Sequence, residues 1–315
     1  MSIKEKIREN ISLKEFNTFR VGGEVKYYLE VKSKDDLMDG FQFAQENELK
    51  TYILGGGSNI VTPDSGINGL VLHISNDEKQ AKGDRLDLGA GVSLAQAASL
   101  ALNSSLSGLE WSSGIPRATV GGAIRGNAGA FGTCMQDIVE TVEIYNSKRN
   151  EFETLSKNMC LFSYRSSIFK QKPQFLVWKT ILKLEHKEKN EIEEKMEESL
   201  EFRKTKYPQL PSAGSVFTNI DPEIAKQANP ILFNREFKDK IGREGWLSAG
   251  LIIEKAGLKG KSMGGIKISL EHANHIVNTG KGTSEEIIMM ISYIKQQVRN
   301  KFGIQLVEEV TYFGF

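Results

Sequence analysis

The amino-acid sequence predicts an α+β protein that is built from more than one domain. The chain has 315 residues, which is near the length at which a single hydrophobic core stops growing. Stretches that alternate apolar and polar residues, as half-buried strands do, are interspersed with stretches whose apolar residues recur at helical spacing. The composition also changes after Pro211, where a glycine- and serine-rich loop follows a long charged segment.

The elements of the first half follow from local patterns. The predicted strands cover residues 27–31, 51–54, 70–74 and 85–88. Ser33 and Asp36 have the spacing of a capping box that opens a helix, and Ser93 precedes a second helix whose alanines and leucines recur at helical spacing. Strands therefore alternate with helices along this part of the chain.

The second half continues the mixed pattern. The predicted elements are strands over 139–145 and 175–184, helices over 186–206 and 248–256, a helix capped by Thr283 and Glu286, and a final strand over 304–313. The segment 186–206 is highly charged but has apolar residues at helical spacing and no glycine or proline, which favours a surface helix over a disordered run. The last helix and strand suggest a short βαβ-like tail.

The charge and the cysteine content exclude several functions. Forty-one basic and forty acidic side chains give a formal charge of +1, which indicates neither a nucleic-acid nor a membrane partner. Cys134 and Cys160 form neither a metal-ligand pair nor a disulfide framework, and His272 and His275 lack the carboxylates of a zinc site. There is no run of about 18 apolar residues and no apolar signal core. We expect a cytoplasmic protein without a metal site.

A first glycine-rich loop follows the predicted strand 51–54. It consists of Gly55, Gly56, Gly57, Ser58 and Asn59. Glycines after a strand can expose successive backbone N–H groups in a concave nest that binds a phosphate or pyrophosphate. The loop is not a Rossmann fingerprint, because Ile60 occupies the position of the third glycine. A tight turn without a ligand remains the alternative for this loop taken alone.

A second glycine-rich stretch extends over residues 108–132, where glycines are interleaved with apolar residues rather than with the polar residues of a flexible linker. Such a stretch lets the main chain lie directly against a flat ligand, although a purely structural loop is the alternative. A pyrophosphate site and a planar-ring site together describe FAD. The hydride chemistry would then belong to the cofactor, and the protein would supply position and electrostatics.

The sequence resembles the MurB family of UDP-N-acetylenolpyruvoylglucosamine reductases over nearly its whole length. The resemblance is carried, in order, by residues 17–23, 55–59, 114–132, 164–169, 211–217, 256–260 with 272–274, and 303–310. It implies non-covalent FAD, NADPH as co-substrate and a UDP-sugar substrate. The implied reaction reduces the enolpyruvyl ether of UDP-N-acetylglucosamine to UDP-N-acetylmuramate, the lactyl ether used in peptidoglycan synthesis. The family gives no expectation beyond a monomer.

The resemblance also implies a domain organisation and a set of binding residues. Residues 1–75 and 76–205 would form a two-subdomain FAD-binding unit of the vanillyl-alcohol-oxidase type, and 206–315 an α+β substrate domain whose last strand carries a catalytic glutamate. The implied cofactor contacts are Gly55, Gly56, Gly57, Ser58, Asn59, Gly114, Ile115, Pro116, Thr119, Gly121, Gly122, Asn127, Ala128 and Gly129. The implied substrate contacts are Tyr164, Arg203, Lys206, Asn219, His272 and Asn274.

Three residues match the family's catalytic positions. An enol ether resists hydride unless its conjugated carboxylate is polarised, and Arg165 is implied as the cation that stabilises the developing enolate. Ser215 is implied as the donor that protonates the enolic carbon. Glu309 is implied to help stabilise the enol, with its neighbour Glu308 on the opposite strand face. We expect Glu309 to be protonated or paired, because a bare charge would oppose an anionic intermediate.

The sequence departs from the family pattern beside the second glycine stretch. Arg117-Ala118 stands where the family usually has one glycine, which makes Arg117 either an extra phosphate contact or a surface residue. The segment 169–203 is too short for the substrate-capping tyrosine loop, so the chain resembles the branch without it. A different flavin oxidase or dehydrogenase of the same fold is the main alternative function, and a non-catalytic nucleotide-binding protein is another.

Overall fold

Two compact units make up the protein in the computed structural model, which describes residues 3–242 and 244–315. The first unit comprises the described residues up to 11 together with 25–57 and 67–203. The second comprises 12–24, 58–66 and the described residues from 204 to the end. The chain passes to the second unit for the last time after Arg203. The predicted domain boundaries, after residue 75 and after residue 205, stay predictions.

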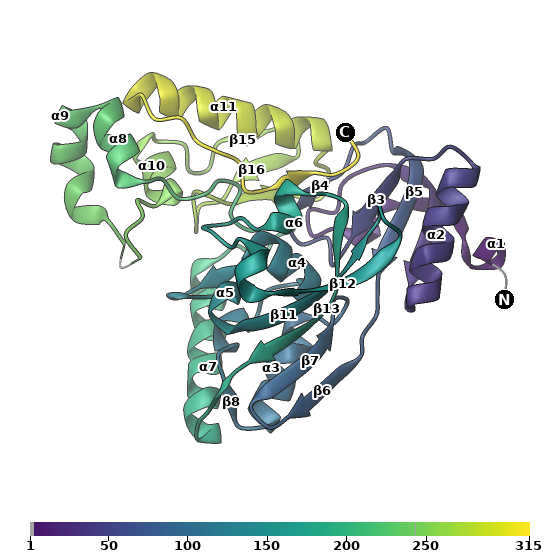
Figure 1. Cartoon of the computed structure of the whole chain (residues 1–315). Coiled ribbons are helices and arrows are strands. Elements are labelled where there is room, and N and C mark those ends of the chain that lie inside the picture. The colour runs from purple at the N-terminus through teal and green to yellow at the C-terminus, as the bar shows by residue number, and fades with distance from the viewer. Residues whose placement is uncertain (1–2, 243) are drawn as a thin grey trace. The chain divides into compact units, whose positions relative to one another are not determined.

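A four-stranded sheet opens the first unit. Its order is β1 (Arg8–Ser12), β2 (Glu24–Val31), β5 (Ile67–Ile74) and β3 (Thr51–Leu54). Because β5 is parallel to both β2 and β3, the carboxyl ends of these three strands share one edge of the sheet. The helix α2 (Lys34–Glu46) follows β2 and lies along this sheet (Figure 1), and it begins with the predicted capping box of Ser33 and Asp36.

A five-stranded antiparallel sheet forms the rest of the first unit. Its order is β12 (Glu151–Ser156), β11 (Val139–Asn146), β13 (Phe175–Lys183), β7 (Arg85–Gly89) and β6 (Lys79–Lys82). Two short pairs accompany it: β8 (Leu106–Ser107) with β14 (Glu185–His186), and β9 (Gly129–Ala130) with β10 (Thr133–Cys134). One buried cluster joins both sheets, with Leu29 and Leu72 from the first and Val142 and Leu182 from the second.

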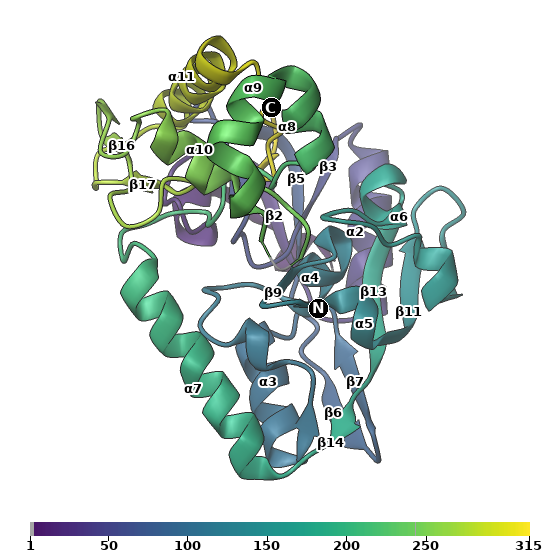
Figure 2. The same ribbon diagram turned by 90° about the vertical axis from the view of Figure 1, so that its left-hand side faces the viewer.

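Helices and turns connect these strands. They are α1 (Ile3–Lys6), α3 (Leu94–Asn103), η2 (Glu110–Ser112), α4 (Val120–Gly126), α5 (Met135–Ile138), η3 (Lys157–Cys160), α6 (Ile168–Gln171) and α7 (Lys189–Lys206). In Figure 2, α3 lies between α7 and the strands β6 and β7. Of the 18 residues of α7 only Ile192, Ser199 and Arg203 are buried, so the predicted charged surface helix is confirmed.

The second unit packs helices against short strands. Its elements are η1 (Leu13–Phe16), β4 (Ile60–Val61), α8 (Pro222–Ala228), α9 (Pro230–Leu232), η4 (Phe233–Phe237), η5 (Lys238–Lys240), α10 (Ala249–Lys255), β15 (Ser262–Met263), β16 (Ile266–Ile268), β17 (Ile276–Asn278), α11 (Ser284–Phe302) and β18 (Thr311–Tyr312). Strands β15, β16 and β17 form one antiparallel sheet. Phe19 and Val61, far away in the sequence, share a buried cluster with Ile291 and Ile294 of α11.

The α+β prediction is confirmed, but the predicted final strand over 304–313 is largely wrong. Only Thr311–Tyr312 pairs as a strand, and it pairs in parallel with β4, so the βαβ-like tail is not formed with β17. Ile304, Leu306 and Val310 are buried in alternation, which produced the strand-like pattern. Their segment is extended against the core without a continuous ladder. No helix in the described ranges is long and apolar enough to cross a bilayer.

Candidate active site

The structure brings the two glycine-rich stretches together at the carboxyl end of β3. A Cβ built on Gly56 would lie 1.4 Å from the carbonyl oxygen of Arg117, and one built on Gly55 would lie 2.9 Å from Oγ1 of Thr119. Gly57 has a φ of +68°, a conformation that disfavours other residues. The first loop is therefore glycine because the backbone of the second stretch runs directly against it.

Side chains hold the carbonyl groups of this first loop. Nε of Arg117 donates to the carbonyl oxygen of Gly56 at 3.1 Å. The ring of His73, on β5, hydrogen-bonds the backbone of Gly55 and lies 2.5 Å from the hydroxyl of Tyr28. A trans peptide directs its C=O and its N–H in opposite directions. Fixing the two carbonyls therefore aims the N–H groups that follow them away from these side chains, as an anion nest requires.

His73 is largely buried and is surrounded by charges of both signs. Burial is the largest cause that lowers the pKa of His73, and the charges of Arg117 and Arg8 add to it, while Glu30 opposes it. Burial also raises the pKa of Tyr28 to about 12. The guanidinium of Arg8 lies 4.6 Å from the centre of the Tyr28 ring. At neutral pH the imidazole is thus uncharged, and its Nδ1 shares a hydrogen bond with a protonated phenol.

The glycines of the second stretch have different roles. Thr119 caps α4, and its Oγ1 accepts from the N–H of Gly122 at 3.4 Å. A Cβ at Gly121 would lie 2.7 Å from the Cβ of Ala90, so Gly121 serves packing within the protein. A Cβ at Gly122 would meet only Thr119 Oγ1, at 3.4 Å. No neighbouring atom in the part of the chain that the structure describes therefore requires glycine at 122, which is the pattern expected where a ligand lies against the backbone.

Asn127 shapes the end of this stretch. It ends α4 in the left-handed conformation, with a φ of 43°. Its amide nitrogen donates to the carbonyl of Ser163 at 2.9 Å and to the side chain of Gln136 at 3.0 Å, and its amide oxygen accepts from the N–H of Gln136 at 2.9 Å. The buried side chain of Asn127 thus joins the glycine stretch to the segment that carries Arg165.

Arg165 is held next to the same stretch. Its Nη2 donates to the carbonyl of Gly129 at 3.0 Å, and its guanidinium carbon lies 5.5 Å from the ring centre of Tyr164. Its φ is +53°, and Lys170 donates to its carbonyl oxygen at 2.9 Å. A non-glycine residue in this region costs on the order of 1–3 kcal/mol and persists where its surroundings impose it. The structure therefore fixes a cation at the edge of the second glycine stretch.

Arg203 is buried within the first unit, at 8% exposure. Its Nη2 donates to the carbonyl of Trp111 at 2.8 Å, and its guanidinium carbon lies 5.3 Å from the ring centre of Phe131. Nε1 of Trp111 and Oγ of Ser113 are buried without a hydrogen-bond partner in the described part of the chain. Buried polar groups are normally paired, so these two atoms mark a place suited to a polar ligand.

In the second unit the backbones of Ser215 and Glu309 are adjacent. The N–H of Glu309 donates to the carbonyl of Val216 at 2.8 Å, which places Glu309 beside the residue that follows Ser215. Asn59 donates to the carbonyl of Glu309 at 3.1 Å. The carboxylate of Glu308 is engaged by Lys295 at 2.8 Å. The two residues expected to work together are therefore supported by neighbouring segments, whereas Arg165 belongs to the first unit.

Three of the expected substrate contacts support this segment. Asn274 is buried, accepts from the N–H of Phe217 at 3.0 Å and donates to its carbonyl at 2.8 Å. Asn219 accepts from the N–H of Ala249, the first residue of α10, at 3.2 Å. Nδ1 of His272 accepts from the N–H of Asn274 at 3.2 Å, and burial lowers the pKa of His272. Asn274 thus orders the backbone two residues after Ser215, His272 orders Asn274, and Asn219 holds the start of α10.

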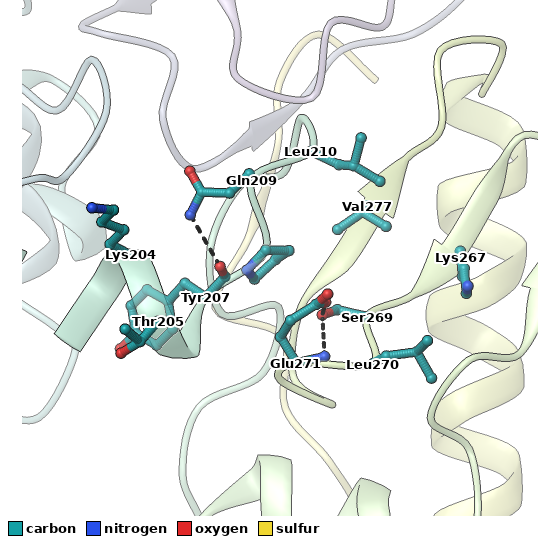
Figure 3. Close-up of a pocket in the computed structure, with 11 residues that line it drawn as sticks. Lys204, Thr205, Tyr207, Gln209, Leu210, Lys267, Ser269, Leu270, Glu271 and Val277 are labelled. Carbon is teal, nitrogen blue, oxygen red and sulfur yellow. Dashed lines mark hydrogen bonds between the residues drawn. The ribbon is translucent and has the colours of Figure 1, made fainter. Parts of the chain in front are cut away.

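A cavity of about 340 Å³ lies in the second unit. Figure 3 shows Lys204 and Lys267 on opposite sides of it, and Tyr207 and Glu271 along its wall. The Tyr207 ring packs 5.5 Å from the ring of His272 and 4.9 Å from that of His275, whose backbone pairs with Ser215. The predicted phosphate contact Lys206 is exposed and is not among the lining residues; its neighbour Lys204 is.

Comparisons with known proteins decide the family. Residues 25–153 match an FAD binding domain, and residues 205–313 match the C-terminal domain of UDP-N-acetylenolpyruvoylglucosamine reductase. The UDP-N-acetylenolpyruvoylglucosamine reductase of Caldanaerobacter subterraneus subsp. tengcongensis is 35% identical over 319 residues, covering 99% of this chain and 97% of that protein. The chain belongs to the UDP-N-acetylenolpyruvoylglucosamine reductase family.

Other members agree with this assignment. The UDP-N-acetylenolpyruvoylglucosamine reductase of Bacillus subtilis is 31% identical over 312 residues, covering 98% of this chain and 94% of that protein. The crystal structure of the reductase from Thermus caldophilus matches with a TM-score of 0.76 at 30% identity, covering 97% of this chain and 99% of that one. The resemblance inferred from the sequence motifs is thereby confirmed. As a member of this family the protein is an FAD-binding oxidoreductase.

The residues of the first unit fit FAD. The matched FAD binding domain includes both glycine stretches. Gly56 leaves no room for a side chain, and in the described chain the N–H groups of Gly56 and Gly57 donate to no backbone or side-chain group. Free N–H groups in a turn bind a pyrophosphate, and the bare face of Gly122 suits a planar ring. When bound, the cofactor supplies hydride transfer, and the loops supply its position.

Sequence reasoning missed the residues that support the first glycine loop. Tyr28 and His73 lie on strands and fit the alternation of a buried sheet, so no local signal separates them from core residues. Arg8 lies on an edge strand and looks like a solvated charge. The departure from the family pattern at Arg117 was the one available signal. Its neighbour Ala118 is buried and its carbonyl accepts from the N–H of Leu94, so the extra residue is packed into the fold.

Proposed function

We propose that this reductase uses NADPH to reduce its FAD, and that the enolpyruvyl ether of UDP-N-acetylglucosamine then receives the hydride and a proton. The product is UDP-N-acetylmuramate, a precursor of peptidoglycan. The observation that carries the proposal is the fixed guanidinium of Arg165, whose Nη2 is anchored on Gly129 in the second glycine stretch. A cation that is held in advance needs no reorganisation when negative charge develops next to it.

The charge balance of the reaction defines what Arg165 does. Hydride adds to the terminal methylene carbon of the substrate, and the electron pair of the double bond moves into the conjugated carboxylate as an enolate. The planar guanidinium suits both oxygens of that carboxylate. Tyr164 packs on the guanidinium of Arg165, and Lys170 donates to the backbone carbonyl of Arg165. These contacts restrict the conformations that Arg165 can adopt.

Protonation of the enolate falls to Ser215, with Glu309 as its partner. The enolic carbon takes the proton from the serine hydroxyl, and the serine is restored by proton transfer from solvent or from the carboxyl of Glu309. The support for this assignment is the backbone contact between Glu309 and Val216, which holds the two segments next to each other. Proton transfer of this kind needs fixed geometry, since a serine hydroxyl is a weak acid.

The proposal extends to the surroundings of the reaction. The exposed ammonium of Lys206 at the end of α7 and the buried guanidinium of Arg203 are suited to the diphosphate of the UDP-sugar. Both NADPH and UDP-sugars are metabolites of the cytoplasm, where we expect the enzyme to act as a monomer. A flavin oxidase or dehydrogenase with a different substrate is the alternative outcome.

An anaerobic two-step experiment separates these outcomes. The flavin of the purified protein is first reduced with NADPH, and the enolpyruvyl sugar nucleotide is then added while flavin absorbance is followed. Rapid reoxidation of the flavin with formation of UDP-N-acetylmuramate is expected. Reoxidation by oxygen once air is admitted, or reduction of the oxidised flavin by an unrelated alcohol, with no reoxidation by the enolpyruvyl substrate, would instead assign the chain to the alternative.

A further inference from the structure

Arg117 combines an unfavourable backbone conformation with a side-chain contact to the first glycine loop. Its φ is +56°, in the left-handed region that favours glycine, and its carbonyl oxygen lies where a Cβ on Gly56 would be. This conformation turns the side chain toward the first glycine loop, where Nε donates to the Gly56 carbonyl at 3.1 Å. The extra residue at this position therefore places a guanidinium on the loop at the expense of backbone strain.

The guanidinium of Arg117 lacks a carboxylate partner in the ranges the structure describes. Among the described residues its one hydrogen bond uses Nε, and no salt bridge to another described residue includes it. Glu30, whose charge acts on the same His73 ring as that of Arg117, is paired with Lys32 at 3.4 Å. Arg8, over the ring of Tyr28, adds a second cation to the same end of the sheet. An uncompensated cation on a loop with free N–H groups is an arrangement that attracts a multiply charged anion.

We propose that Arg117 is a cofactor-binding residue that pairs directly with the pyrophosphate of FAD and gives this enzyme its preference for FAD over flavins that lack the pyrophosphate. Nε keeps its bond to Gly56, and the two Nη groups bind phosphate oxygens, for which the guanidinium fork is well suited. The inference rests on the FAD part of the proposed function only. It holds whatever substrate the reduced flavin serves.

Two substitutions separate this role from a structural one. Arg117→Gly removes the side chain and at the same time relieves the strain of the positive φ, so the bare loop keeps or gains stability. Arg117→Gln keeps a donor that can reach the Gly56 carbonyl but carries no charge. Arg149→Ala is the matched control, because Arg149 is a surface arginine of the same unit that pairs with Glu151 and Glu153.

Flavin affinity is the readout. Each holoenzyme is diluted, and the fluorescence of released FAD gives its Kd at low and at high salt; the apoprotein is then titrated with riboflavin. The loss of a charge-assisted pair should raise the Kd for FAD by about ten- to hundredfold in both Arg117 variants. Their Kd for FAD should also depend less on salt than that of the wild type, and their affinity for riboflavin should match it within about twofold.

Two results would overturn the assignment. If Arg117→Gly binds FAD as tightly as the wild type with the same salt dependence, the residue serves only the shape of the loop. If FAD and riboflavin lose affinity equally, the contact is not with the pyrophosphate. Failure to reduce the enolpyruvyl sugar would reject the proposed reaction and leave the Arg117 assignment standing, whereas unchanged FAD binding by both Arg117 variants would reject the assignment and leave the proposed reaction standing.

Discussion

Gly56 offers the sharpest test of how the two glycine stretches build the proposed cofactor site. In Gly56→Ala the added Cβ would lie 1.4 Å from the carbonyl oxygen of Arg117, whereas real Cβ contacts are essentially never below 3.0 Å. Both partners are backbone, so no side chain can rotate away and one loop must move. Overpacking of this kind costs about 1–3 kcal/mol, and here we expect about 3 kcal/mol because a whole segment must shift.

The displacement should also abolish the alignment of the N–H groups that follow Gly55 and Gly56. We expect the Kd for FAD to rise more than about hundredfold, measured by flavin fluorescence, alongside the loss of stability measured by urea unfolding of the apoprotein. Gly122→Ala is the matched variant, because its Cβ meets only Thr119 at 3.4 Å. The Gly122→Ala apoprotein should be as stable as the wild-type apoprotein, but it should bind FAD more weakly than the wild type does. A Gly56→Ala protein with unchanged stability and full flavin content would refute the packing argument.

Three further predictions concern other parts of the protein. Arg165→Met should lower kcat by about 10²–10³-fold while flavin content stays unchanged, as single-turnover flavin reoxidation can show; an active variant would remove Arg165 from the reaction. Glu309→Gln should lower kcat, whereas Glu308→Gln breaks only the half-exposed pair with Lys295 and should cost about 1 kcal/mol of stability or less; equal kinetic effects would contradict the assignment. Burial lowers the pKa of His275 to about 3, below its ordinary 6.5, so the unfolded chain binds the proton first as the pH falls. Unfolding free energy should decline between pH 6.5 and 3, on the order of a few kcal/mol in total, and less steeply in His275→Gln; identical slopes would show that His275 does not contribute.

The elements that the sequence predicts well are those in which local chemistry and tertiary packing agree. Ser33 with Asp36 and Thr283 with Glu286 form the predicted capping boxes, because both bonds of such a box lie within four residues of chain. The strand Thr51–Leu54 has the predicted bounds, because continuing it through the glycines that follow would cost conformational entropy. Short-range signals of this type do not depend on where the rest of the chain lies.

The parts that the sequence could not predict depend on contacts between distant segments. His73 hydrogen-bonds the backbone of Gly55 only because β3 and β5 are parallel and in register, with Leu54 opposite His73. Arg117 reaches Gly56 across 61 positions of sequence. Neither residue type carries a pattern that reveals its partner. The candidate cofactor loop could therefore be found from its glycines, while the side chains that orient it required the structure.

The mistaken final strand and the position of Glu309 have the same physical cause. Residues 304–310 are held in place because alternate side chains are buried. Their backbone makes a few individual hydrogen bonds to the segment around Val216 and no continuous ladder. A regular strand there would fix Glu309 relative to a sheet. The observed arrangement fixes Glu309 relative to Val216, the neighbour of Ser215. The segment around Val216 is in turn held by the backbone carbonyl and by the side-chain amide of Asn274. The irregular backbone thus places Glu309 beside the residue that follows Ser215, and Ser215 and Glu309 are the two residues to which we assign the protonation. Asn274→Ala should accordingly weaken protonation of the substrate more than binding of the flavin.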